Sequence, residues 1–177
     1  MDIAVLFADV RGSTALGEKL QPSAYAALLN RFYRAATEVL IRHDAIIDKL
    51  IGDEVMALFI PGICGPEYHR HAVEAAAALL RAVGYGESGE PWVALGGAVH
   101  SGMTYVGNVG SEVVDFTALG DTVNTASRLA SSAAAGEVLL SETVYAKVAE
   151  HFPNLEKRSL MLRGKEASTD ARILGVA

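Results

Sequence analysis

The sequence has little of what disulfide-bonded, exported or membrane-spanning proteins require. Its 177 residues include one cysteine, Cys64, so no internal disulfide can form, which is typical of proteins in a reducing compartment. No apolar run approaches the roughly 18 residues of a membrane-spanning helix. The first residues, MDIAV, lack the basic segment that opens a signal peptide. We therefore expect a cytoplasmic location, or the cytoplasmic face of a membrane protein, with no membrane segment in this chain.

Positive charge is also in deficit. Lys and Arg total 15 against 21 Asp and Glu, a net charge of −6, so we predict no nucleic-acid partner, because domains that bind nucleic acids are usually basic. The hydrophobic content of 51% and the charged content of 20% are those of a folded globular protein.

The length fits one domain. Because a predicted strand begins at Ile3, we expect 1–177 to be a single domain cut from a longer protein.

Hydrophobic periodicity predicts alternating strands and helices. The expected elements are strand 3–8, helix 23–42, strands 45–51 and 55–60, helix 67–83, strands 92–100, 103–109 and 113–119, helix 121–130, strand 137–140, helix 142–151, and strands near 155–163 and 169–176. A Gly-Asp pair joins the second and third strands and is a hairpin signal. The order βαββαβ predicts an α+β, ferredoxin-like fold: a palm-type antiparallel sheet with helices packed on it, plus C-terminal additions.

Two carboxylates stand where predicted strands end. Asp9 follows a run of six apolar residues, and Asp53 lies in the predicted hairpin turn. The predicted fold sets their strands side by side, and paired carboxylates on rigid strand ends suit Mg²⁺ or Mn²⁺, which would bridge phosphate oxygens. The alternative interpretation is local: turn chemistry for Asp53 and capping of the next segment for Asp9.

The loop after the first strand and one helix offer phosphate contacts. Gly12, Ser13 and Thr14 belong to a loop whose backbone N–H groups could face a triphosphate, although no Walker A sequence is present. Asn124 and Arg128 are four apart and share a helix face, where they could hold a sugar oxygen and a phosphate. An ordinary solvated helix face is the alternative.

Other polar and sulfur-containing side chains are interpreted as structural. We expect Asp121 to cap its helix, and Met56 and Met103 to lie in the core. His69 and His71 are two apart on a helix, so they point apart and are expected on the surface. No histidine cluster has metal-ligand spacing.

Five stretches together resemble the class III nucleotidyl cyclase homology domain, the catalytic domain of adenylyl and guanylyl cyclases. They are FADVRGST (7–14), DKLIGDEVMA (48–57), HSG (100–102), VGNVG (106–110) and DFTALGDTVN (115–124). The resemblance implies conversion of ATP to 3′,5′-cyclic AMP and pyrophosphate with two Mg²⁺ or Mn²⁺ ions. It assigns roles to seven residues: metal binding to Asp9, Val10 and Asp53, purine recognition to Lys49 and Thr117, and transition-state stabilisation to Asn124 and Arg128.

The resemblance also predicts which base is bound. Lys49 is a donor only, so it favours the acceptor N1 of adenine over the N1–H of guanine. Thr117 can accept from the adenine 6-amino group. Threonine at this position is similar to the subgroup of bicarbonate-responsive adenylyl cyclases.

The resemblance further implies a homodimer with two equivalent sites. In the family, one subunit gives the aspartates and its partner gives the purine-binding and transition-state residues. This chain carries both sets, so two copies would complete both sites and a monomer would be inactive. We expect fusion to an unseen regulatory domain.

Two departures from the family keep alternatives open. Family members often carry an arginine at the position of Gly96, and Arg163 or Lys165 stands in for a C-terminal lysine that holds phosphate. The alternatives are a degenerate domain that binds nucleotide or dimerises, and a guanylyl cyclase. A diguanylate cyclase would require Gly-Gly-[Asp/Glu]-Glu-Phe, whereas the hairpin reads IGDEV.

Overall fold

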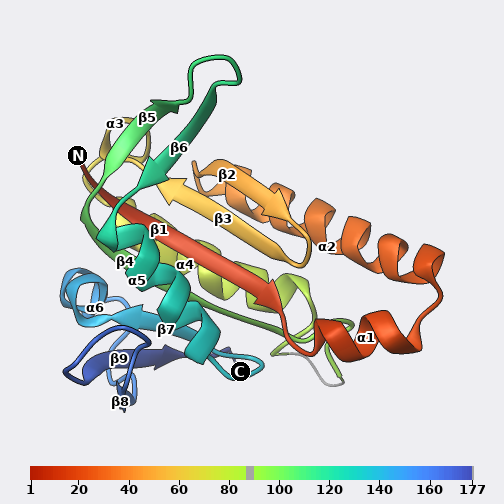
Figure 1. Ribbon diagram of the computed structural model, residues 1–177. Coiled ribbons are helices and arrows are strands. Elements are labelled where there is room, and N and C mark those ends of the chain that lie inside the picture. Colours follow the sequence, from red (N-terminus) through yellow and green to blue (C-terminus); the bar gives the residue numbers. More distant parts are fainter. Residues whose placement is uncertain (87–89, 177) are drawn as a thin grey trace.

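The computed structural model describes residues 1–86 and 90–176 (Figure 1). Its elements in chain order are β1 (Asp2–Val10), α1 (Ser13–Lys19), α2 (Pro22–Arg42), β2 (Ile46–Ile51), β3 (Glu54–Phe59), α3 (Pro61–Cys64), α4 (Tyr68–Ala82), β4 (Leu95–Met103), β5 (Tyr105–Val109), β6 (Asp115–Leu119), α5 (Asp121–Ser132), β7 (Val138–Ser141), α6 (Glu142–Val148), β8 (Lys157–Leu160) and β9 (Thr169–Leu174). Among the described residues, no helix is long and apolar enough to cross a membrane.

The predicted βαββαβ arrangement is confirmed. Seven strands form one sheet in the order β2-β3-β1-β4-β7-β9-β8, and β1 lies antiparallel to both β3 and β4. The C-terminal additions extend this sheet, because β7 pairs with β4 in parallel and β9 and β8 follow it in antiparallel pairing. Strand β1 therefore lies inside the sheet, between β3 and β4.

Strand β1 is apolar on both faces because both faces are covered. Its even-numbered side chains, such as Leu6, pack in the cluster that includes α2 and α4, and its odd-numbered ones, such as Phe7, pack in the cluster that includes α5. Figure 1 shows α5 on one side of the sheet and α2 and α4 on the other. By this alternation Asp9 belongs to the α5 face.

Helix sequence explains which faces are buried. The 3–4 spacing of Phe32, Ala36 and Leu40 gives α2 a fully buried stripe. Helix α5 buries Ala126 and Leu129 against the opposite face of the sheet and leaves Asn124 exposed. One helix therefore presents a polar face directly beside the sheet surface that carries Asp9.

A two-stranded arm of β5 and β6 projects beyond the main sheet (Figure 1). Large apolar side chains along it are exposed: Tyr105, Val109, Val113, Val114, Phe116 and Leu119. Thr117 and Ala118, in contrast, are buried against the rest of the fold. The arm is therefore anchored at its base and apolar on its outer surface.

Several local expectations are wrong. Ser13 and Thr14 lie in the first turn of α1 and not in a loop, and Gly12 precedes them with a φ of +71°. Met56 is buried as expected, but Met103 is 72% exposed because it ends β4 at the rim of the sheet. Residues 87–89, between the expected helix 67–83 and the expected strand 92–100, lie outside the described residues.

Helix α5 begins differently from the expectation. Its N-cap residue is Gly120, with a φ of +132° that favours glycine, and no side chain caps it. Asp121 stands in the first turn instead and pairs with Lys165 Nζ at 3.3 Å. A carboxylate in this position still complements the helix dipole.

Candidate active site

The two predicted metal-binding aspartates lie at neighbouring strand ends. Asp9 is the last but one residue of β1 and is opposite Glu54 of β3. Asp53 lies in the turn between β2 and β3, and its carbonyl oxygen accepts a hydrogen bond from the backbone N–H of Val10 at 3.0 Å. The backbone thus holds Asp9, Val10 and Asp53 together, as the strand order predicts.

The carboxylates of Asp9, Asp53 and Glu54 lie close together with little compensating positive charge. Burial raises the pKa of Asp9 to about 6, against the lowering effect of the Arg11 guanidinium, and the nearby charge of Asp53 raises it further. The pKa of Glu54 is also raised, first by burial and then by Asp9 and Asp53. Glu54 was not predicted as part of the site, although its position directly after Asp53 in the predicted hairpin could have indicated that it lies near the aspartates.

The aspartate pair fits a hard divalent cation. The buried Oδ1 of Asp9 accepts no hydrogen bond, although Arg11 Nη2 approaches it at 3.1 Å. A bound cation would compensate the negative charge of this buried oxygen atom. Within the described chain no three histidine, cysteine or acidic side chains are already gathered around one point. The two carboxylates of Asp9 and Asp53 suit Mg²⁺, which is usually held by one or two carboxylates together with phosphate and water oxygens.

Arg11 occupies the space beside Gly96. Its guanidinium donates to the carbonyl oxygen of Ala130 in α5, and a Cβ atom on Gly96 would overlap the Arg11 Nε. Gly96 lies opposite Asp9 in the sheet. A guanidinium therefore lies over position 96, although it comes from residue 11, which sequence reasoning did not single out.

Lys49 and Thr117, the two residues predicted to recognise the purine, lie within hydrogen-bond distance of each other. Lys49 Nζ donates to Thr117 Oγ1 at 3.1 Å, and also to the carboxylates of Asp48 and Asp115, each at 3.0 Å. Asp115 and Asp48 raise the pKa of Lys49, so its ammonium stays charged at neutral pH. Sequence reasoning missed both carboxylates.

Asn124 and Arg128 project from α5 without partners in the described part of the chain, where their side chains make no hydrogen bond or ion pair. Arg128 shares a hollow of about 360 Å³ with Arg163 and the hydroxyls of Ser127, Ser131 and Ser132. Lys165 is instead held by Asp121. Of the two basic C-terminal candidates, Arg163 is therefore the one beside Arg128.

One chain does not assemble all these groups. Among the described residues, no hydrogen bond or ion pair joins the aspartates Asp9 and Asp53 to Lys49, Thr117 or Arg128.

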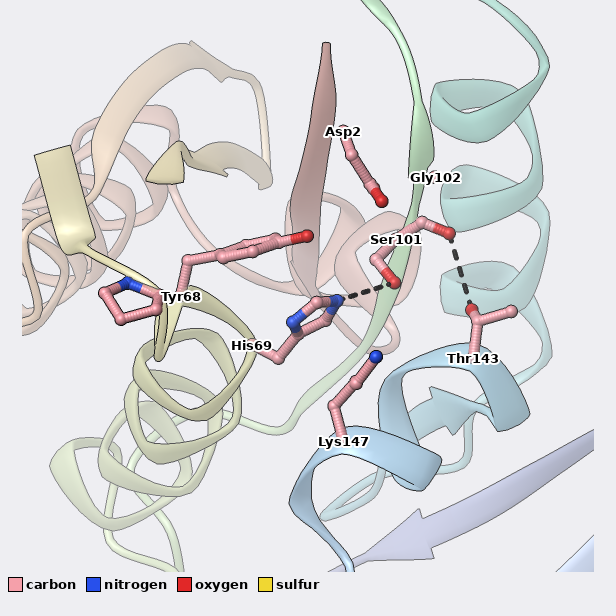
Figure 2. Close-up of a pocket in the computed structure, with 8 residues that line it drawn as sticks. Asp2, Tyr68, His69, Ser101, Gly102, Thr143 and Lys147 are labelled. Carbon is pink, nitrogen blue, oxygen red and sulfur yellow. Dashed lines mark hydrogen bonds between the residues drawn. The ribbon is translucent and has the colours of Figure 1, made fainter. Parts of the chain in front are cut away.

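A second hollow lies at the opposite end of β1 and contains none of the residues predicted to bind metal or nucleotide (Figure 2). It measures about 340 Å³ and is lined by Asp2, Tyr68, Ser101 and Lys147, among others. His69, which we expected on the surface, is buried there with its Nε2 3.2 Å from Ser101 Oγ. Burial lowers the pKa of His69, which favours the neutral imidazole.

A family model and the curated relatives of this chain indicate the same protein family. Residues 1–173 match the family described as adenylate and guanylate cyclase catalytic domain. An adenylate cyclase of Anabaena cylindrica is 30% identical over 175 residues, which cover 93% of this chain and 35% of that protein. The chain spans about a third or less of the length of the first curated relatives that it matches.

Solved structures share the fold over the whole chain. The guanylyl cyclase Cya2 has a TM-score of 0.87 at 24% identity and covers 100% of this chain and 93% of its own. The adenylyl cyclase CyaB from P. aeruginosa has a TM-score of 0.81 at 27% identity, with 99% and 95% covered. Both an adenylyl cyclase and a guanylyl cyclase are therefore similar to this chain, so similarity alone does not decide between adenine and guanine as the base.

Proposed function

The chain belongs to the family of adenylate and guanylate cyclase catalytic domains, and we propose that it converts ATP into 3′,5′-cyclic AMP and pyrophosphate in a site shared by two copies of the chain. One observation carries the choice of ATP: Lys49 Nζ and Thr117 Oγ1 lie 3.1 Å apart, on strands that are distant in sequence. The two residues thus form a single polar edge for a purine.

That edge matches adenine. The ammonium of Lys49 only donates, and the proton that now pairs with the exposed Asp115 would turn to the unprotonated N1 of adenine, whereas it would oppose the N1–H of guanine. A hydroxyl oxygen at Thr117 can accept from the 6-amino group. Because the neighbouring carboxylates keep Lys49 charged, this preference holds across the neutral pH range.

Asp9 and Asp53 would hold the divalent cations. Bound Mg²⁺ or Mn²⁺ lowers the pKa of the ribose 3′-hydroxyl and stabilises the leaving pyrophosphate. Two residues of the chain itself would act on the substrate. The delocalised positive charge of Arg128 would compensate the negative charge on the oxygens of the reacting phosphorus, and Asn124 would orient the ribose. The backbone N–H groups from Gly12 to Thr14, with Arg163 or Lys165, are the proposed triphosphate contacts.

Two copies of the chain are needed in this proposal. The apolar outer surface of the β5–β6 arm supports it, because an exposed apolar patch of this kind is typical of a protein–protein contact. A two-fold axis would place the aspartates of one copy opposite Lys49 and Arg128 of the other, giving two equivalent sites.

A direct assay tests the proposed activity. The purified chain is incubated with ATP or GTP and with Mn²⁺ or Mg²⁺, and the cyclic nucleotide is quantified by chromatography. We expect cyclic AMP to form with a higher kcat/KM for ATP than for GTP. Equal or better use of GTP would identify a guanylyl cyclase, and no turnover with either nucleotide would indicate a degenerate domain.

A further inference from the structure

Asp48 is a buried carboxylate directly behind the base-reading pair. Its side chain has no exposed area. One oxygen, Oδ1, accepts from Lys49 Nζ at 3.0 Å, and the other, Oδ2, accepts from Thr117 Oγ1 at 2.9 Å and from the backbone N–H of Ala118 at 3.2 Å. Three donors thus satisfy a charge that would otherwise be costly to bury.

A β-bulge explains how two neighbours in sequence reach the same threonine. Adjacent residues of a regular strand point to opposite faces of the sheet. Between Ile47 and Lys49 the pairing of β2 with β3 shifts register, so Asp48 has no regular partner on β3. This irregularity brings both Asp48 and Lys49 within hydrogen-bond distance of Thr117.

The bond to Asp48 decides what Thr117 can do for a ligand. A hydroxyl has one proton to donate, and an ionised carboxylate can only accept. Because the proton of Thr117 Oγ1 points at Asp48 Oδ2, the hydroxyl can offer a ligand only a lone pair. One lone pair already accepts from Lys49 Nζ, which leaves one further acceptor position.

We propose that Asp48 is the positioning residue for base selection: it fixes the Thr117 hydroxyl as an acceptor toward the bound purine. An acceptor at this place binds the 6-amino group of adenine and opposes the carbonyl oxygen O6 of guanine. Without Asp48 the hydroxyl can turn and donate to O6. The proposal rests on the proposed function, because it concerns the base that the same site reads.

Binding measurements isolate the contact to the 6-amino group. The probe is displacement of a fluorescent, ribose-labelled ATP by ATP or by purine riboside triphosphate, which keeps the acceptor N1 but carries hydrogen at position 6. We expect the wild-type protein to bind ATP about 2- to 12-fold more tightly, the range of one ordinary hydrogen bond. A ratio near one would overturn the proposal without any variant.

A double-mutant cycle tests the role of Asp48 itself. Asp48→Ala and the milder Asp48→Asn should reduce the ATP preference toward one and improve GTP binding relative to ATP. In a Thr117→Val background the ratio should already be near one and should not change when Asp48 is replaced. Thr117→Ser, which keeps the hydroxyl, should retain the wild-type ratio.

Asp115→Asn is the matched control. Asp115 also pairs with Lys49 but makes no hydrogen bond to Thr117, and its side chain is 61% exposed. Its replacement should leave the ratio between ATP and purine riboside triphosphate unchanged. An equal loss of preference in the Asp48 and Asp115 variants, or the same Asp48 effect in the Thr117→Val background, would overturn the proposal. Because the readout is binding, an inactive wild-type enzyme would contradict the proposed function and not this inference.

Discussion

The guanidinium of Arg11 lies over Gly96, in the space that any side chain at position 96 would fill. Gly96 is opposite Asp9 in the β1–β4 pairing, and Arg11 approaches the Asp9 carboxylate at 3.1 Å. The resemblance implies that many relatives carry an arginine at position 96, whereas here the guanidinium of Arg11, which directly follows β1, fills the space beside the glycine. The absence of an arginine at 96 does not leave the site without positive charge.

Substitution of Gly96 tests this packing. Gly96→Ala should displace the guanidinium of Arg11 and break its hydrogen bond to Ala130, which would lower the free energy of unfolding by about 0.5–1.5 kcal/mol. Urea unfolding measures the effect. In an Arg11→Ala background the same substitution should cost little. If Gly96→Ala were equally destabilising in both backgrounds, the contact with Arg11 would not be its cause.

Removal of either aspartate should abolish turnover. Asp9→Ala and Asp53→Ala each delete a proposed cation ligand, whereas Asp170→Ala removes a carboxylate that pairs with Lys157 and serves as the control. Cyclic nucleotide production with Mn²⁺ is the measurement, and size-exclusion chromatography checks that dimers still form. A variant that kept more than about a tenth of the rate, a loss of only 1.4 kcal/mol, would not have lost a metal ligand.

The raised pKa of Asp9 predicts how stability depends on pH. Its value of about 6 lies above the ordinary 3.8, so the folded protein holds a proton that the unfolded chain releases. Stability from this group is present at low pH and is lost as pH rises from about 4 to 6, by up to about 3 kcal/mol in the absence of metal. Glu54, also raised, acts in the same direction.

The comparison that isolates this effect is with Asp9→Asn, which cannot ionise. Relative to the wild type, the variant should gain stability between pH 4 and pH 7 when both are unfolded by urea with a chelator present. Addition of Mg²⁺ at pH 7.5 should stabilise the wild type and not the variant. A stability difference that does not change with pH would show that Asp9 titrates normally.

Charge reversal at Lys49 should change the base that is used. Lys49→Glu replaces a donor by an acceptor, which suits the N1–H and 2-amino groups of guanine. A polar match to a base is worth roughly 1–3 kcal/mol, so the ratio of kcat/KM for GTP over ATP should rise about 5- to 150-fold. The new carboxylate would face Asp48 and Asp115, so absolute rates should stay low. An unchanged ratio would exclude Lys49 as a base-reading residue.

Sequence patterns predicted the parts of the fold that local periodicity encodes. The long apolar stripe of α2, the buried run of β1 and the polar face of α5 are each visible in a few neighbouring residues, and the order of elements then determines the sheet. Helices α1 and α3 were missed because seven and four residues are too few for a period to appear.

Long-range placement explains what could not be predicted. His69 is buried because β4 brings Ser101 to it, a contact between residues 32 apart. Asp48 reaches Thr117 through a β-bulge, which no periodicity reveals. The Arg11–Gly96 contact likewise depends on the pairing of β1 with β4. In each case a residue's role is set by a neighbour that is distant in sequence.

Complementation between two inactive chains tests the shared site most directly. An Asp53→Ala chain and an Arg128→Ala chain are each assayed alone, then mixed under conditions in which chain exchange is shown independently. Each mixed dimer should contain one intact site, so activity should return to about a quarter of the wild-type level when half of the dimers are mixed. No recovery despite demonstrated exchange would contradict a catalytic site built from two copies of this chain.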